Sequence, residues 1–413
     1  MLVKGIRALT SRPVVGVGRF TSPDVMARMI KSGTLDFIGC ARPSIADPFL
    51  PLKIEEGRPE DIRECIGCNI CITGDMTHGM GRCTQNPTWM EEWRRGWHPE
   101  KMNAKSESAS VLIVGAGPAG LEAARALSMR GYDVAPAEAG TVLGGRVANE
   151  RLLPGLSAWG RVADYRAYQI RQRPNVETYF DSRLTADDIL AFGFQNICIA
   201  TGSHWRGDGV ARLHVTPIPG TEASSDSLPV FTPDDIMAGR LPKGRVVVYD
   251  NDHFYLGGVI AEKLTHEGCA VALVTPSPMV SYWTQFTLEQ EKIQRRLVSL
   301  DIGLHTQLTI ESIEESFVAC SSELTAEKVR LPCDAVVLLS DRTPNDGLYQ
   351  QLIPMRDDGR LASLRLIGDA EAPNIIAQAV FAGHLAAREF GEAAQEGTPF
   401  KVERVAPQTG PQR

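Results

Sequence analysis

Short apolar runs alternate with amphipathic segments over the first part of the chain, and this alternation is typical of strands and helices in a parallel sheet. The runs Pro13-Val-Val-Gly-Val-Gly18 and Leu35-Asp-Phe-Ile-Gly39 predict two buried strands. Between them, the segment from Ser22 to Lys31 has helical periodicity, with Ser22 as the expected cap and Pro23 in the first turn. The pattern therefore predicts two successive strand-helix units.

A second series of apolar segments begins after residues 91–110, a polar stretch that is predicted to be a linker. Beyond it the chain again alternates strands with helices, which predicts an α/β fold with parallel sheets. The expected strands are residues 110–114, 132–136, 195–200, 245–249, 334–340 and 364–369. The expected helices are residues 121–130, 258–266 and 375–390.

Composition narrows the class of protein. The 413 residues are 43% hydrophobic and 23% charged, which suits a globular protein of two or three domains. A net charge of −7 without a dense basic run argues against nucleic acid as the main partner. Because no apolar run approaches about 18 residues and the N-terminus lacks a secretory pattern, we expect no membrane span and a cytoplasmic location.

Four of the nine cysteines stand in the spacing C-x2-C-x2-C-x11-C, at Cys65, Cys68, Cys71 and Cys83. Three thiolates at this spacing can wrap three corners of a cubane around a turn at Gly67, and the fourth arrives from a longer loop. Structural zinc and unrelated buried cysteines are the alternatives, although zinc sites usually join two separate C-x2-C pairs. The spacing predicts a [4Fe-4S] cluster. The other five cysteines are scattered, as reduced core residues are.

A glycine-rich turn, Gly115-Ala-Gly-Pro-Ala-Gly120, follows the first strand of the second series and opens a helix. In such a G-x-G-x-x-G turn the glycines let the backbone approach a pyrophosphate at the helix N-terminus. Glu138, 18 residues after Gly120, suits a contact to a ribose 2′-hydroxyl. An adenine nucleotide or dinucleotide site is predicted, with a plain glycine turn as the alternative. Its candidate residues are Gly115, Gly117, Pro118, Ala119, Gly120, Glu138 and Gly145.

Two later segments offer further contacts to this nucleotide. Thr201 and Gly202 form a glycine turn at a strand end, which topology alone would also explain. Gly368 and Asp369 stand at another strand end, just before an apolar helix. Asp369 is therefore a candidate contact to a nucleotide sugar or to the ribityl chain of a flavin, and a bare helix cap is the alternative.

Residues 241–273 repeat the strand-turn-helix pattern but lack the glycines of a phosphate-binding turn. The turn reads Asp250-Asn-Asp-His-Phe-Tyr-Leu-Gly257, so glycines are missing where a phosphate needs close approach. Asp250 and Asp252 would also repel a pyrophosphate. We interpret this segment as a Rossmann-like unit that has lost its nucleotide, and a modified but working NAD(P) site is the alternative.

Taken together, these motifs resemble a known family. The chain is similar over essentially its whole length to the trimethylamine and dimethylamine dehydrogenase group, which are iron-sulfur flavoproteins related to the Old Yellow Enzymes and share the architecture of the 2,4-dienoyl-CoA reductases. Besides the cysteine loop, the segments that carry the resemblance are Gly16–Arg19, Gly39–Pro48, Cys83–Asn86, Arg95–Glu100, Val114–Pro118, Ala200–Gly202 and Ile367–Pro373. Runs such as Arg-Gly-Trp-His-Pro-Glu have no generic structural explanation.

The resemblance implies cofactors and partners. In this family an eight-stranded barrel carries FMN, and electrons pass from the substrate to FMN, to the [4Fe-4S] cluster and to an electron-transferring flavoprotein. Its amine dehydrogenases hold ADP where the reductases hold FAD, and we expect ADP here. A homo-oligomer is also expected. The implied FMN phosphate site, in the loops after the last two barrel strands, consists of Gly16, Gly18, Arg19, Gly39, Ala41 and Arg42.

The resemblance and the element pattern also predict the domains. Residues 1–60 are expected to be the C-terminal remnant of an FMN-binding barrel, and residues 61–109 the cluster loop and linker, with Trp93, Trp97 and His98 packing the linker against the barrel end. The other expected domains are an ADP or FAD domain at 110–228 and 341–400, an inserted degenerate NAD(P)-type domain at 229–340, and a frayed tail at 401–413.

The barrel is expected to be incomplete, because a barrel of this type takes about 250 residues. Six of its strands, with the family's substrate-binding and catalytic groups, would lie elsewhere, and no catalytic residue is predicted. A fragment of a longer gene product, a partner chain that supplies the other strands, or a protein without substrate would each explain this. Two isolated barrel strands would leave an unpaired edge.

Amine oxidation is the activity that the resemblance implies. A substrate-shaping tryptophan of the trimethylamine enzymes corresponds to about Asp75 here, so we expect another N-methylated or secondary amine. An NADPH-dependent 2,4-dienoyl-CoA reductase-like enzyme is the alternative, against which the Asp250 turn argues. A non-catalytic electron-relay or interaction subunit is an alternative of a different class.

Overall fold

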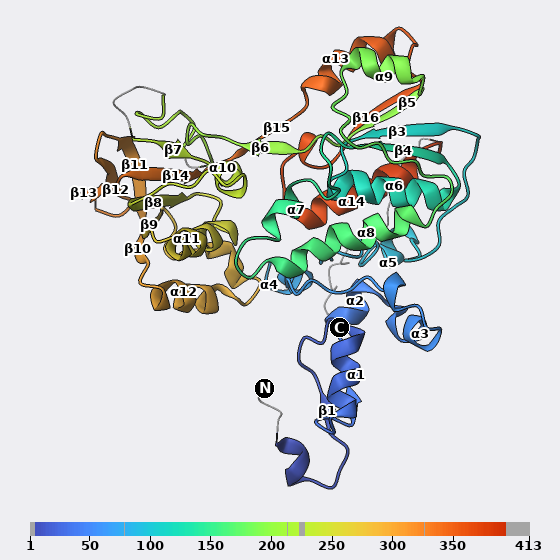
Figure 1. The fold of residues 1–413 in the computed structure, drawn as a ribbon, viewed down its shortest axis with the longest axis horizontal. Helices are drawn as coiled ribbons and strands as arrows, with labels where there is room; N and C mark the ends of the chain where they lie inside the picture. Colours follow the sequence, from blue (N-terminus) through green and yellow to red (C-terminus); the bar gives the residue numbers. More distant parts are fainter. Residues whose placement is uncertain (1–4, 78, 213, 223–227, 326, 394–413) are drawn as a thin grey trace, which may run out of the picture.

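The structure is a computed structural model, shown as a ribbon in Figure 1. It describes residues 5–77, 79–212, 214–222, 228–325 and 327–393. The expected tail at residues 401–413 therefore lies outside the described residues. Across the described ranges, each helix is too short or too polar to cross a bilayer.

The N-terminal region is a pair of strands with helices packed beside it (Figure 1, blue). Strand β1 (Val15–Gly16) pairs in parallel with β2 (Phe37–Ile38), and α1 (Pro23–Lys31) connects them. The strands are shorter than predicted because, within the described chain, each pairs on one side only, which leaves Val15 60% and Phe37 57% exposed. Ser22 makes no side-chain cap bond, contrary to expectation, so Pro23 marks the helix start. The region also contains η1 (Ile6–Leu9), α2 (Arg42–Ala46), α3 (Leu50–Glu55) and η2 (Pro59–Asp61).

The segment that follows is more structured than a linker. It contains η3 (Ile70–Ile72), α4 (Thr73–Thr77) and α5 (Glu92–Arg95). Trp97 packs on Phe381 and His384 of a C-terminal helix, with ring centroids 5.8 and 5.3 Å apart, and not on the barrel end as expected. His98 does contact the N-terminal region, since it stacks on Phe49 at 5.7 Å. The segment therefore bridges the N-terminal strands and the first sheet.

Four parallel strands form the first sheet, in the order β16 (Ser363–Leu366), β5 (Asn196–Ile199), β3 (Ser110–Val114) and β4 (Asp133–Ala137). One face is covered by α6 (Pro118–Arg130), α8 (Arg161–Arg171) and α14 (Ile376–Glu389), and the other by α9 (Ala186–Phe192) and α13 (Gly347–Asp357). Because both faces are buried, the strands appear in the sequence as continuous apolar runs. Shorter helices are α7 (Arg146–Glu150), η4 (Ser157–Gly160) and η6 (Gly368–Ala370).

The second sheet has five parallel strands, in the order β10 (Gly303–Thr306), β9 (Ala270–Thr275), β8 (Arg245–Asp250), β14 (Ala335–Leu339) and β7 (Val230–Phe231). One of its faces packs on α10 (Pro233–Met237), α11 (Leu256–His266) and α12 (Gln290–Ser299), with η5 (Tyr282–Gln285) nearby. The opposite face packs on an antiparallel sheet of β11 (Leu308–Ile313), β12 (Phe317–Ser322) and β13 (Lys328–Pro332), which the sequence analysis did not predict.

A two-stranded ribbon joins the two sheets (Figure 1). Strand β6 (Ser203–Trp205) leaves the first sheet, and β15 (Arg342–Pro344) returns to it antiparallel to β6. Because residues 230–339 lie between these strands in the chain, the second sheet is inserted into the first domain through this ribbon.

Candidate functional site

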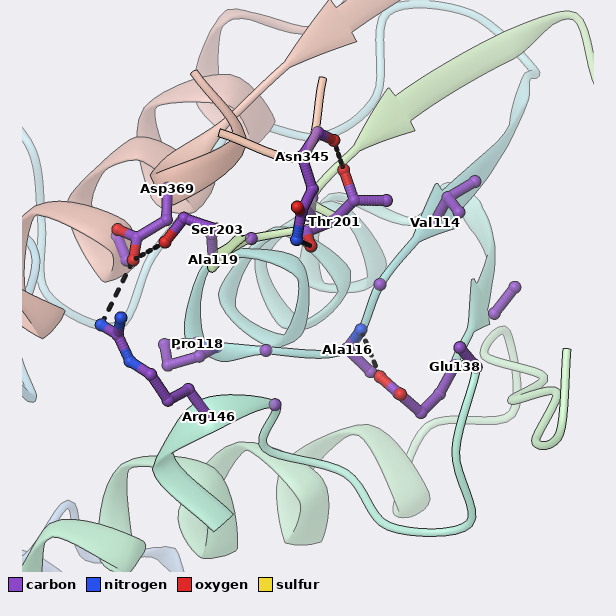
Figure 2. Close-up of a pocket in the computed structure, with 18 of the residues that line it drawn as sticks. Val114, Ala116, Pro118, Ala119, Glu138, Arg146, Thr201, Ser203, Asn345 and Asp369 are labelled. Carbon is purple, nitrogen blue, oxygen red and sulfur yellow. Dashed lines mark hydrogen bonds and ion pairs between the residues drawn. The ribbon is translucent and has the colours of Figure 1, made fainter. Parts of the chain in front are cut away.

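A cavity of about 630 Å³ lies where β3, β4 and β5 end and α6 begins. Figure 2 shows the side chains around it. Several candidate nucleotide residues line this cavity together: Gly115, Gly117, Pro118, Ala119, Glu138, Gly145, Thr201, Gly202 and Asp369. Parallel sheets bind ligands at this edge, beyond the carboxyl ends of neighbouring strands.

The glycines of the turn are required by close backbone contacts. Gly115 has φ +102°, and a Cβ atom there would lie 2.4 Å from the carbonyl oxygen of Ala200. A Cβ at Gly120 would lie 2.0 Å from the carbonyl oxygen of Gly115, so this glycine packs the helix on the strand behind the cavity. Gly117 and Gly145 face each other instead, with 3.9 Å from a Cβ at Gly117 to the Gly145 Cα. The backbone is therefore bare where a phosphate would approach.

Glu138 holds the glycine turn from one end of the cavity. Its carboxylate oxygens accept hydrogen bonds from the backbone N–H groups of Ala116 at 2.9 Å and Gly140 at 3.0 Å. Figure 2 shows Glu138 across the cavity from Asp369 and Arg146. The predicted ribose contact of Glu138 is compatible with this place, and it remains a prediction.

Asp369 lies at the other end among cationic groups. Its carboxylate accepts hydrogen bonds from Ser203 Oγ at 3.2 Å and from the Asn374 N–H at 3.1 Å. It also pairs with Arg146 at 3.3 Å and with Arg342. Burial and the neighbouring Arg146 charge lower the pKa of Arg342. Neither arginine was predicted as part of the site, because no local motif marks them and they lie 223 and 27 residues from Asp369 in the chain.

The remaining candidate residues support the walls of the cavity. The Thr201 hydroxyl donates to the carbonyl oxygen of Asn345 at 2.6 Å, and the Asn345 amide donates back to the Thr201 carbonyl at 3.1 Å. Gly368 has φ +65°, and a Cβ there would lie 2.6 Å from the Ala119 Cβ. The contacts of Thr201 and Gly368 are therefore structural. They agree with the simpler alternatives for these residues, a turn at a strand end and close packing.

Beyond Asp369 the space narrows sharply. The adjoining cavity, which shares Arg146 and Ile376 with the first, has about 80 Å³ and is also lined by Trp205, Arg342 and Cys68. This volume has room for a few water molecules. Arg146 lines both cavities, and its Nη1 is buried without a hydrogen-bond partner among the described residues.

The structure places the four motif cysteines around one small cavity. Cys65, Cys68, Cys71 and Cys83 line a space of about 20 Å³ together with Arg42 and Asn69. Gly67 and Asn69 have left-handed φ angles of +73° and +58°, which turn the loop around this space. The Cys65 sulfur accepts a hydrogen bond from the Gly67 N–H at 3.4 Å, and the Cys68 sulfur lies 3.2 Å from the Thr84 hydroxyl.

Burial disfavours the thiolate form of the cysteines in this cavity unless a positive group accompanies them. Burial raises the pKa of Cys68 to about 11 and that of Cys83 to about 12, and the neighbouring cysteines add to both shifts. Thiolates confined here repel one another unless positive charge lies between them. The donor set therefore fits an iron-sulfur core. In the parts of the chain that are described, His, Cys, Asp and Glu side chains form no group of three or more arranged for a single metal ion.

Comparisons with known proteins identify the family. Residues 1–61 match the NADH:flavin oxidoreductase / NADH oxidase family, residues 113–182 an NAD(P)-binding Rossmann-like domain, and residues 231–327 the OYE-like second alpha/beta domain. Dimethylamine dehydrogenase from Hyphomicrobium sp. (strain x) is 39% identical over 435 residues, covering 98% of this chain and 58% of the relative. The chain belongs to the amine dehydrogenase group related to the Old Yellow Enzymes.

Solved structures of this group superpose closely on the chain. Histamine dehydrogenase from Rhizobium sp. 4-9 has a TM-score of 0.93 at 60% identity, over 98% of this chain and 60% of that one. The 6-hydroxypseudooxynicotine amine oxidase from Pseudomonas geniculata N1 has a TM-score of 0.91 at 48% identity, over 94% of this chain and 58% of that one. The chain thus spans about three fifths of the length of these relatives.

The FMN phosphate residues that membership of the amine dehydrogenase group implies are divided between two places. Arg19, with φ +54°, forms an ion pair with Glu289 of the second domain at 3.0 Å. Arg42, which follows Ala41 at the start of α2, binds the Asn69 side chain beside the cysteine cavity. Each guanidinium uses a single nitrogen in that contact, so further N–H groups remain for a phosphate beside Glu289 or Asn69.

The glycines of that implied site serve the packing of β1 and β2. A Cβ at Gly16 would lie 2.3 Å from the Leu35 side chain, and a Cβ at Gly39 2.5 Å from the Val17 side chain. Gly18 is open, with Phe20 3.7 Å from a Cβ placed there. Of these three glycines, Gly18 has the most room for a ligand.

In the second sheet, β8 ends in Asp250, whose carboxyl group lies at the start of the turn that leads into α11. Asp250 is fully buried, and its Cγ would lie 2.5 Å from a Cβ at Gly257 in the first turn of α11. Burial, with the Asp252 charge, raises the pKa of Asp250 to about 7, and His253 N–H donates to it at 2.9 Å. This carboxyl occupies the helix start that a pyrophosphate would need, which supports the interpretation that the turn has lost its nucleotide.

Proposed function

We propose that this chain functions in an iron-sulfur flavoprotein amine dehydrogenase, where it holds a [4Fe-4S] cluster, an ADP molecule and part of an FMN phosphate site. The observation that carries the proposal is the gathering of Cys65, Cys68, Cys71 and Cys83 around one buried cavity. Arg42 also lines this cavity and belongs to residues 1–61, which match the flavin oxidoreductase family. Cys68 borders, in addition, the 80 Å³ cavity next to the proposed nucleotide site.

The four thiolates would hold the cluster, which supplies one-electron transfer between a flavin and an external acceptor. Ile66, which is 6% exposed, lines the cavity beside the cysteines and would help to keep water from it. As the family resemblance implies, we propose an electron-transferring flavoprotein as the acceptor.

ADP is proposed in preference to FAD for the large cavity. Its extent from Glu138 past the glycine turn suits an adenosine with two phosphates. Beyond Asp369, where the flavin of FAD would continue, only about 80 Å³ remains between Arg146 and Arg342. The unpartnered Nη1 of Arg146 offers a donor to a terminal phosphate instead.

The proposed substrates are amines whose C–N bond is oxidised. The relatives carry the names of dimethylamine, a secondary amine, and of histamine, a primary amine. Sequence reasoning at Asp75, whose side chain is outside the described set, favours an N-methylated or secondary amine. The 60% identity to histamine dehydrogenase favours a primary amine on a short chain. A trial of both amine types separates these two substrate classes.

The test uses protein purified anaerobically with any chain that accompanies it. We expect about four iron atoms and four acid-labile sulfides per chain, one acid-extractable adenine nucleotide, and amine-dependent reduction of an artificial dye. Material without iron and sulfide would contradict the proposal. Stoichiometric FAD release would contradict the choice of ADP.

The alternative, a 2,4-dienoyl-CoA reductase-like enzyme, predicts rapid NADPH consumption. The buried Asp250 carboxyl at the turn after β8 argues against this alternative, because it stands where NADPH phosphates would bind. A partner chain with further barrel strands remains a prediction, which the exposed faces of Val15 and Phe37 support. Identification of such a chain in the purified material would support it. Finding the cluster without FMN would favour an electron-relay subunit.

A further inference from the structure

Gln85 ties the two arms of the cysteine loop together. It lies two residues after Cys83 and is 1% exposed. Its amide nitrogen donates to the carbonyl oxygen of Glu64, the residue before Cys65, at 3.0 Å, and to that of Arg161 at 3.3 Å. One side chain therefore connects the approach to the first cysteine with the exit from the fourth.

Arg166 of α8 holds Gln85 in place. Its guanidinium donates to the Gln85 side-chain oxygen at 2.9 Å and to the Gln85 carbonyl at 3.0 Å. It also donates to Glu122 of α6 at 2.8 Å and to the Val162 carbonyl at 2.9 Å. Because a planar guanidinium held by four hydrogen bonds has little freedom, the position of Gln85 is determined by α6 and α8 rather than by the loop.

Glu122 anchors this arrangement in the core of the nucleotide domain. It is fully buried, one turn of α6 after Pro118 in the nucleotide cavity, and also accepts hydrogen bonds from Arg125 at 2.6 Å and from His384 at 2.8 Å. Burial alone would raise the pKa of Glu122. The charges of Arg125 and Arg166 and the hydrogen bond from His384 instead hold this pKa well below its usual value. Apolar residues of similar volume often stabilise a core at least as well as such buried ions.

We propose that Gln85 and Arg166 are positioning residues for the iron-sulfur cluster, which fix the separation between the Cys65 and Cys83 arms of its loop. The inference rests on the cluster of the proposed function. Ligands that are held by a packed outer layer keep the geometry on which metal affinity and redox potential depend. A network that served the fold alone would change stability and leave the spectrum and potential of the cluster unchanged.

The experiment compares three variants of the anaerobically purified holoprotein. Gln85→Leu removes both the donor to Glu64 and the acceptor for Arg166. Gln85→Glu keeps the acceptor and removes the donor. His384→Leu is the control, because His384 bonds to Glu122 and Arg388 and makes no hydrogen bond to Gln85 or Arg166.

For Gln85→Leu we expect an altered electron paramagnetic resonance spectrum of the reduced cluster, a shifted midpoint potential, and iron loss to a chelator that is about tenfold faster. Gln85→Glu should show the same changes to a smaller extent. His384→Leu should lower the melting temperature and keep the spectrum, the potential and the iron release rate of the parent protein.

The proposal is overturned if Gln85→Leu folds and retains its nucleotide with unchanged spectrum, potential and iron release. If Gln85→Leu does not fold, Gln85→Glu decides by the same three measurements. A parent protein without iron and labile sulfide would contradict the proposed cluster itself and remove this inference with it. Failure of the inference alone leaves a cluster of normal stoichiometry in every variant.

Discussion

At the scale of single residues, the two Rossmann-like turns differ in what stands at the end of the strand. In the first domain β3 is followed by Gly115, whose bare backbone lines the nucleotide cavity. In the second domain β8 ends in Asp250, whose carboxyl lies against Gly257 of the next helix. The first turn thus has room for a phosphate, whereas the second is filled by a negative group of its own.

The titration of Asp250 provides a prediction on stability. Its pKa in the folded protein, about 7, lies above the ordinary value of 3.8. The folded state therefore binds this proton more tightly, and the associated stability is present below about pH 4 and is lost as the pH rises through 7. Asp250→Asn, which mimics the protonated form, should gain stability over the parent between pH 4 and pH 8, by about 1 to 4 kcal/mol. Denaturant unfolding of both proteins at pH 4 and pH 8 measures the gain. A difference in unfolding free energy between variant and parent that is the same at both pH values would contradict the prediction.

A second prediction at this scale concerns the fourth cysteine. If Cys83 is a ligand of the proposed cluster, Cys83→Ser replaces its thiolate with a poor ligand, so most of the iron should be lost while the proposed adenine nucleotide is retained. Cys269→Ala is the control, because Cys269 is buried in the second domain and lies outside the motif. Iron and nucleotide analysis of both variants checks this. Equal iron content in Cys83→Ser and the parent protein would show that Cys83 is not a ligand.

At the scale of elements, the nucleotide site depends on how closely α14 approaches α6. A Cβ at Gly383 of α14 would lie 2.1 Å from the carbonyl oxygen of Ala119 and 3.1 Å from the Ala123 nitrogen. Ala119 also lines the nucleotide cavity. The first turn of α6 is therefore positioned by a helix that follows it by more than 250 residues in the chain.

Gly383→Ala should force the two helices apart. Overpacking of this kind costs about 1–3 kcal/mol, and the displaced first turn of α6 should also release nucleotide. Gly207→Ala is the control, because a Cβ at that exposed position, outside the cavity, meets only the Thr232 side chain at an ordinary 3.6 Å and should change stability by less than about 0.5 kcal/mol. Urea unfolding and adenine content measure both effects. Matching results for the two variants would contradict the prediction.

At the scale of the whole molecule, the nucleotide cavity depends on the ribbon that joins the two sheets. Ser203 of β6 and Arg342 of β15 both bind Asp369, so the ribbon closes one end of the cavity. A ligand there contacts groups that also determine how the second domain is attached. Nucleotide binding should consequently stabilise the arrangement of both domains.

ADP should raise the melting temperature of nucleotide-stripped protein, with about 2.7 kcal/mol of stabilisation at a concentration 100 times its dissociation constant. FAD should produce a much smaller shift, because its flavin would meet Arg146 and Arg342. Arg342→Ala should reduce the ADP shift, while Arg360→Ala, which removes an exposed pair with Asp358, should leave it unchanged. A larger shift with FAD than with ADP would contradict the proposed nucleotide.

Local pattern predicted much of the fold and the site. The strands around Val111, Ile197 and Val247 and the helices after Gly120 and Gly257 follow from apolar periodicity and punctuating glycines. The β11-β12-β13 sheet was missed because its strands are partly exposed and lie in a segment assigned to the inserted unit as a whole. Trp97 was assigned to the wrong surface, because its partners on α14 are almost 300 residues away.

By itself, the sequence determined the alternation of strands and helices, the cysteine spacing and the glycine turn, because these depend on neighbours within a few residues. Only the tertiary structure decided that Arg146 and Arg342 narrow the end of the nucleotide cavity. It also decided that Gln85, Arg166 and Glu122 connect the cysteine loop to the core. Such contacts join side chains far apart in the chain, and a buried charge leaves no periodic mark that distinguishes it from a solvated one.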